Sequence, residues 1–82
     1  MIYVGMDVHK RSTTFCAIDE EGQVVKRGKV SSGDEGWHKA LSQWEPPEVR
    51  VALETGCLTW WAVDSLCRLG VEPVVVDARS FK

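Results

Sequence analysis

Residues Ile2–Lys10 read IYVGMDVHK, and this stretch predicts the first strand of the protein. Apolar residues dominate it as far as Val8, and a polar cluster follows directly. In a strand with alternating faces, the aliphatic residues at even positions share one side, and Tyr3, Gly5 and Asp7 share the other. A lone carboxylate in a strand this apolar costs free energy unless it is hydrogen-bonded, paired or bound to a metal. We therefore expect the rest of the chain to supply Asp7 with a partner.

Composition limits the class of protein. Eighty-two residues make one small domain, 1–82, and 44% apolar with 27% charged residues is ordinary for a globular protein. No apolar run approaches the roughly 20 residues of a membrane span, and early charges interrupt any signal-peptide pattern. We therefore expect a cytoplasmic protein without a membrane partner. The net charge of −2 argues against binding nucleic acid by charge alone, although His9, Lys10 and Arg11 form a basic patch beside Asp7.

The first thirty residues predict three antiparallel strands. A turn at 9–12 leads into a second strand at Thr13–Asp19, which is rich in β-forming residues. Glu20, Glu21 and Gly22 form a hairpin turn in which glycine supplies a positive φ. The third strand, Gln23–Val30, is more polar and carries three basic residues, as is typical of a sheet edge.

The second half alternates helices with strands. Ser32 and Glu35 have the spacing of a capping box, and Trp37 begins an apolar helical stripe that runs through Trp44. Pro46 and Pro47 follow and end the helix. A strand at Val49–Glu54 precedes a second helix at Cys57–Leu69, where Gly70 takes the C-terminal cap position. A last strand is predicted at Pro73–Val76.

The order β-β-β-α-β-α-β predicts an α/β fold whose sheet begins antiparallel and continues through right-handed crossovers. Sites in such sheets form at the C-terminal ends of strands. Asp7, Glu54 and Asp77 all fall at such ends. If the first and fourth strands are neighbours, about 4.8 Å apart, their two carboxylates can share a divalent cation. Oxygen ligands favour Mg²⁺ or Mn²⁺ over zinc.

Two segments resemble a known enzyme family. Val4–Lys10, VGMDVHK, looks like the opening G-x-D-x-x-K of the DEDD-class insertion-sequence transposases, which are related to the Piv DNA invertases. Val51–Gly56, VALETG, resembles their second motif, an acid followed by Thr-Gly. Trp60-Trp61 and Val74–Arg79 resemble the helix and strand that follow. Each motif is weak alone, but their order and spacing match over nearly the whole chain.

The resemblance implies an RNase H-like domain, as in Holliday-junction resolvases, in which four acids bind Mg²⁺. The first two acids fall on Asp7 and Glu54. The other two belong to a D-x-x-D element that lies beyond Lys82, so the resemblance makes these residues the N-terminal, truncated part of a catalytic domain. The implied activity is metal-dependent DNA strand cleavage and transfer, with a guide RNA as a further partner in some members. We expect the 82 residues alone to be inactive and to bind metal weakly.

Other polar residues have competing roles. Lys10 has two alternative predicted roles. Its ammonium group approaches a DNA phosphate or the Asp7 cluster, or the side chain is simply solvated. Thr55 is expected to cap the second helix, with support of a metal ligand as the alternative. Asp77 does not match the third acid of the family. Its position at a strand end makes it a candidate only for supporting the metal ligands without binding the metal itself. Trp60 and Trp61 invite base stacking, but the apolar helical stripe favours core or interface packing for Trp61.

Two other classes of function compete with the transposase hypothesis. An actin-like or sugar-kinase N-terminal lobe also opens with a strand, an Asp and a meander, but it would place small residues where His9 and Lys10 stand. A non-catalytic interaction module is the third hypothesis, because an open strand edge and tryptophan-rich helices favour self-association. We expect a homo-oligomer under either this or the leading hypothesis.

Overall fold

The computed structural model describes residues 1–54, 56 and 58–76. Its secondary structure consists of strands and helices in the predicted order. These elements are β1 (Ile2–Val8), β2 (Ser12–Ile18), β3 (Val24–Ser31), α1 (Asp34–Leu41), the 3₁₀ turn η1 (Pro46–Glu48), β4 (Val49–Glu54), α2 (Thr59–Arg68) and β5 (Glu72–Val76). The predicted α/β class is confirmed.

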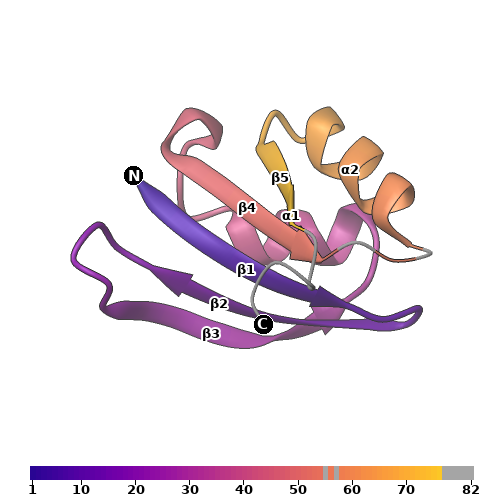
Figure 1. Cartoon of the computed structure of the whole chain (residues 1–82), viewed down its shortest axis with the longest axis horizontal. Coiled ribbons are helices and arrows are strands. Elements are labelled where there is room, and N and C mark those ends of the chain that lie inside the picture. The colour runs from indigo at the N-terminus through magenta and orange to yellow at the C-terminus, as the bar shows by residue number, and fades with distance from the viewer. Residues whose placement is uncertain (55, 57, 77–82) are drawn as a thin grey trace.

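The five strands form one mixed sheet in the order β3-β2-β1-β4-β5 (Figure 1). β1 pairs antiparallel with β2, and β2 with β3, so the first half is the predicted meander. β1 pairs parallel with β4, and β4 with β5. β3 is an edge strand, as its basic residues predicted, and Gly22 has φ +82° in the hairpin turn. This arrangement is consistent with the RNase H-like fold that the resemblance implies.

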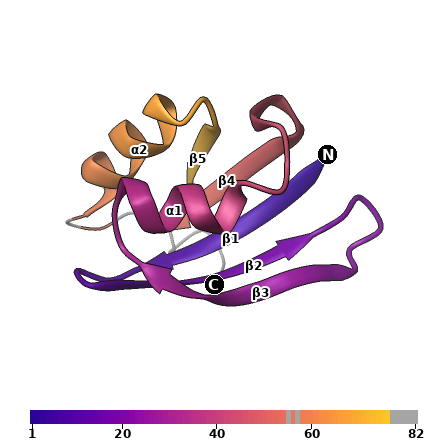
Figure 2. The ribbon, with the colours of Figure 1, turned by 180° about the vertical axis from the view of Figure 1, so that it is seen from behind.

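Both helices lie on one side of the sheet, as the reverse view in Figure 2 shows. Side chains at alternate strand positions meet them and form a single core. Its buried apolar members include Val4, Met6, Phe15, Trp37, Val51, Leu53 and Leu66. Burial of this apolar area is the main driving force of folding. The other side of the sheet, which we call the open face, has no helix of the described chain upon it.

The start of α1 differs from the prediction. Gly33 is the N-cap residue, with φ +119°, and no side chain caps the helix. The predicted Ser32–Glu35 capping box is therefore wrong. The Ser32 hydroxyl instead donates to the carbonyl of His9 and pairs with Thr13 Oγ1 at 2.8 Å. A capping side chain must accept an N–H of the first helical turn through its oxygen, and Ser32 Oγ instead contacts His9 and Thr13.

The end of α1 also comes earlier than predicted. The helix ends at Leu41 with Ser42 as its C-cap, several residues before Pro46. Trp44 therefore lies beyond the helix, although it still packs against the core. Within the helix, Trp37, Ala40 and Leu41 are buried as the apolar stripe predicted.

The end of α2 follows the predicted glycine cap. Gly70 has φ +81°, its N–H donates to the Cys67 carbonyl, and the N–H of Val71 donates to the Leu66 carbonyl. These two bonds are the Schellman arrangement that satisfies the last carbonyls of a helix. The buried side of α2 is narrower than predicted, because Ala62, Ser65 and Leu66 are buried while Trp61 is 40% exposed.

A polar cluster joins the two helices and extends from buried Ser65 to exposed side chains. Asp34, in the first turn of α1, accepts hydrogen bonds from Ser65 and Arg68 of α2. Arg68 also pairs with Asp64 one helical turn away. The Ser65 hydroxyl and then the Arg68 guanidinium hold the pKa of Asp34 below its usual value of 3.8. Asp34 and Asp64 in turn raise the pKa of Arg68.

Within the described residues, no helix has the length and apolar character required to cross a membrane.

Candidate functional site

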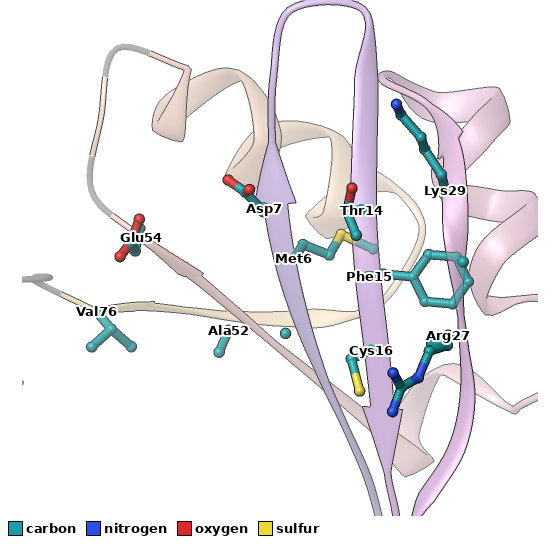
Figure 3. A pocket seen from close by; sticks show the side chains of 12 residues that line it. Met6, Asp7, Thr14, Phe15, Cys16, Arg27, Lys29, Ala52, Glu54 and Val76 are labelled. Carbon is teal, nitrogen blue, oxygen red and sulfur yellow. The ribbon is translucent and has the colours of Figure 1, made fainter.

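Sheet pairing brings Asp7 and Glu54 to neighbouring positions. The Cα of Met6 pairs with that of Leu53 across parallel strands β1 and β4. Asp7 and Glu54 are the next residues on these strands, which lie side by side about 4.8 Å apart. The condition that the sequence left open, namely adjacency of the first and fourth strands, is therefore met. Figure 3 shows both carboxylates on the open face at the same end of the sheet.

The surroundings of Asp7 supply both solvent and a polar partner for its carboxylate. Its side chain is 68% exposed, because Tyr3, Gly5 and Asp7 project from the open face rather than into the core. Solvation removes most of the penalty that a buried carboxylate would carry. The partner that the chain supplies is His9, whose Nε2 lies 3.2 Å from Asp7 Oδ2. A solvated carboxylate with one exchangeable partner is accessible to a cation.

The position of Glu54 depends on a residue that sequence reasoning missed. The hydroxyl of Thr59, at the start of α2, donates to the Glu54 carbonyl at 3.2 Å. The same oxygen accepts the Gly56 N–H at 2.6 Å. Thr59 is buried, with 8% exposure. It therefore fixes the end of β4, and with it Glu54, against the helix that follows. The signal available in the sequence was a threonine five residues after the acid, close to a predicted helix start.

A hollow on the open face lies beside the two carboxylates. We call it the face hollow, and its volume is about 830 Å³. Asp7 and Glu54 line one side, and Arg27 and Lys29 of β3 line the other, with Cys16 of β2 between them and Ala52 on the same strand as Glu54 (Figure 3). A volume of this size is within the range of small-molecule pockets.

A second hollow, which we call the rim hollow, lies at the C-terminal ends of β1 and β4, beside the start of α2. Its volume is about 410 Å³. Asp7 and Glu54 line it too, together with His9, Lys10 and Thr59. The two acids therefore stand between the hollows and can be reached from either. The structure brings Lys10 to the same hollow as the acids, as its first predicted role requires, while leaving its side chain exposed.

A hydrogen-bond chain that begins in the core supports the turn that follows β1. The indole N–H of Trp37 donates to Thr13 Oγ1 at 2.9 Å, and Thr13 contacts Ser32. Because Ser32 uses its hydrogen for the His9 carbonyl, the Thr13 hydroxyl is the donor to Ser32. Trp37 and Thr13 are fully buried. The chain thus ties α1 to the backbone of His9, two residues after Asp7.

Other predicted site residues have mixed outcomes. Thr55 and Asp77 lie outside the described residues. Trp61 packs on Trp37 with ring centroids 5.2 Å apart and is partly exposed. Trp60 is 79% exposed, so it is not a core residue.

The residues present suit a magnesium ion better than a zinc ion. No group of three or more His, Cys, Asp or Glu suited to a metal occurs within residues 1–54, 56 and 58–76. Magnesium often binds through one or two carboxylates and retains several waters, whereas structural zinc needs four protein ligands. Two exposed carboxylates on neighbouring strands fit the first requirement.

No protein-family model matches the chain, and no curated protein matches it either.

Proposed function

We propose that the protein is the N-terminal part of a metal-dependent DNA transposase or recombinase, in which Asp7 and Glu54 hold Mg²⁺ or Mn²⁺ at the site of phosphodiester cleavage. The observation that carries the proposal is the placement of these two acids at the C-terminal ends of neighbouring parallel strands, where both line the same two hollows. The order of the motifs around the two acids supports the choice of DNA as substrate.

The roles of the side chains follow from their places. Asp7 and Glu54 would supply carboxylate oxygens to the cation, and His9 would release Asp7 when the cation binds, because both use the same carboxylate. Lys10, which lines the rim hollow, would meet a phosphate oxygen. When bound, the metal would stabilise charge on the phosphate and favour formation of a nucleophilic hydroxide.

The contact between His9 and Asp7 bears on the kinase-like alternative. A lobe that holds nucleotide phosphates needs a small residue and a hydroxyl directly after the aspartate, so that backbone amides reach the phosphate. Here the imidazole of His9 lies 3.2 Å from the carboxylate. This arrangement favours the metal-site proposal. Binding of ATP with Mg²⁺ to the wild type, lost in Asp7→Asn, would favour the kinase-like lobe over the transposase proposal.

Titration with Mg²⁺ followed by amide NMR spectra tests the proposal. We expect weak binding whose shifts centre on residues near Asp7 and Glu54, and we expect Asp7→Asn and Glu54→Gln each to abolish these shifts. The double variant Glu21→Gln/Glu48→Gln removes two acids, one more than either site variant, from exposed positions away from the hollows and serves as the control. Shifts that survive both site substitutions, or that the control also abolishes, would overturn the proposal.

A further inference from the structure

We propose that Arg27 and Lys29 of β3 position the sugar–phosphate backbone of a single DNA strand that crosses the open face from the acids toward β3. The inference rests on the proposed function for the identity of the ligand. It adds a binding surface and two positioning residues. Arg27 and Lys29 both lie outside the sequence motifs around Asp7 and Glu54.

The sheet register aligns these residues in two neighbouring rows. In the first row, Asp7 pairs with Thr14, and Thr14 pairs with Lys29. In the second row, Gly5 pairs with Cys16, and Cys16 pairs with Arg27. Because paired residues of a sheet point to the same side, each row ends in a basic side chain on the open face. Both basic side chains are exposed and line the face hollow with the acids.

The floor of the face hollow consists of small residues. Gly5 pairs with Ala52 on β4 and with Cys16 on β2. A Cβ atom added to Gly5 would meet no atom within 4 Å, so open space lies above this position. Gly5 does not have a positive φ, and packing does not require its lack of a side chain. The glycine therefore deepens the hollow between the acids and the basic residues.

The charges in the hollow specify the chemistry of the occupant. Arg27 and Lys29 favour an anionic ligand, whereas Asp7 and Glu54 repel an anion unless a cation binds them first. A phosphodiester strand satisfies both requirements, since one phosphate faces the cation at the acids and a later one faces the basic pair. Within the described part of the chain, neither Arg27 nor Lys29 enters an ion pair that would neutralise it.

The distances suit a short stretch of one strand. Asp7 and Lys29 are two strands apart, about 10 Å across the sheet. At about 3.4 Å of rise for each nucleotide of a strand, this width corresponds to about three nucleotides. An acidic peptide could also meet the basic pair, but it would not use a cation at the acids in the same way.

Fluorescence anisotropy with a labelled single-stranded oligonucleotide, measured with Ca²⁺ or Mg²⁺ over a range of salt concentrations, tests the inference. We expect Arg27→Gln/Lys29→Gln to weaken binding severalfold and to reduce the slope of log K against log salt by about 1.4, the value for two phosphate contacts to a single strand. The control is Lys26→Gln/Lys39→Gln. It removes the same charge from the helix side, where Lys26 donates to Gln43 at 2.8 Å.

The outcomes separate this inference from the proposed function. The inference alone would be overturned if the wild type gave the expected Mg²⁺ shifts near Asp7 and Glu54 while Arg27→Gln/Lys29→Gln bound DNA as tightly as the wild type. Absence of Mg²⁺-induced shifts near Asp7 and Glu54 in the wild type would instead overturn the proposed function. An equal effect of the control variant, or equal binding of a polyglutamate peptide, would show that only general charge matters and would also overturn the inference.

Discussion

Thr13 links helix α1 to the turn that follows β1. It accepts the buried indole N–H of Trp37 and passes a hydrogen bond to Ser32. Thr13→Val keeps the shape but leaves that indole without an acceptor, so we expect the free energy of unfolding to fall by about 1–3 kcal/mol. Urea denaturation of Thr13→Val, Trp37→Phe and the double variant measures the coupling between the two residues. Strictly additive effects would contradict the hydrogen-bond chain.

At Gly5, a single substitution is expected to raise the stability of the protein and weaken its binding of DNA. Because the space above it is open and its φ is ordinary, Gly5→Ala is expected to stabilise the protein by about 0.5–1 kcal/mol. The same methyl group would protrude into the face hollow and weaken binding of the oligonucleotide. Thermal unfolding and anisotropy of the same variant test both expectations.

Gly22→Ala is the comparison, since its surroundings are equally open but its φ is +82°. It is expected to destabilise the protein by about 1–2 kcal/mol. Destabilisation by Gly5→Ala of the same size would contradict the account of the hollow.

Asp34 gives the protein a defined dependence on pH. Hydrogen bonds from Ser65 and then Arg68 hold its folded-state pKa below the usual 3.8. A depressed pKa means that the unfolded chain takes up the proton first, so the contribution of Asp34 to stability is present above that usual pKa and is lost as the pH falls through the folded-state value. Urea midpoints of the wild type and Asp34→Asn should therefore converge in acid. Glu35→Gln is the control, and a difference between wild type and Asp34→Asn that grows on acidification would contradict the prediction.

At the scale of elements, the contact of α1 with the end of β3 allows no side chain at Gly36. A Cβ atom there would lie 1.8 Å from the Ser31 carbonyl oxygen, which belongs to the backbone. Helix propensity favours alanine by up to about 1 kcal/mol, but the overlap forces the helix to move. We expect Gly36→Ala to destabilise the protein by about 1–3 kcal/mol. His38→Ala, at an exposed position of the same helix, should change stability by less than about 0.5 kcal/mol. Equal effects would contradict close packing at Gly36.

The elements themselves were largely predictable, since alternation and glycine placement act locally. β1 and β4 have the predicted bounds, and Gly22 and Gly70 adopt the predicted positive φ. The start of α1 was not predictable from local spacing, because Ser32 uses its hydroxyl in contacts with residues distant in sequence. The same limit applies to Trp61, whose partial exposure depends on where α2 crosses α1.

At the scale of the whole molecule, helices cover one face of the sheet and no helix of residues 1–54, 56 and 58–76 covers the other, and the sequence could not show this. Each strand alternates, but a local pattern does not reveal whether helices cover both sides or one. The free-energy cost expected for a lone carboxylate at Asp7 is relieved by solvent for this reason, because its side chain is 68% exposed. The adjacency of Asp7 and Glu54 likewise depended on strand order, which only the assembled sheet supplies. The residue types of the site were predictable, whereas Arg27, Lys29 and Thr59 became candidates only through their spatial positions.

Exposed apolar residues lead us to expect self-association. Tyr3 and Val74 on the open face are each 44% exposed, and Trp60 on α2 is 79% exposed. Large exposed apolar side chains favour protein contacts. Sedimentation velocity should show a fraction of oligomer that increases with protein concentration. Whichever of Trp60→Gln and Tyr3→Gln lowers that fraction more identifies the side of the molecule that forms the contact. A single monomeric species at every concentration would contradict this expectation.

The central claim is that Asp7 and Glu54 hold one divalent cation together. A crystal structure after soaking with Mn²⁺, with anomalous density calculated at the manganese edge, tests it most directly. We predict a peak about 2.2 Å from a carboxylate oxygen of each residue, the usual distance for a small hard cation. Carboxylates more than about 10 Å apart, or a peak bound to only one of the two acids, would contradict the claim.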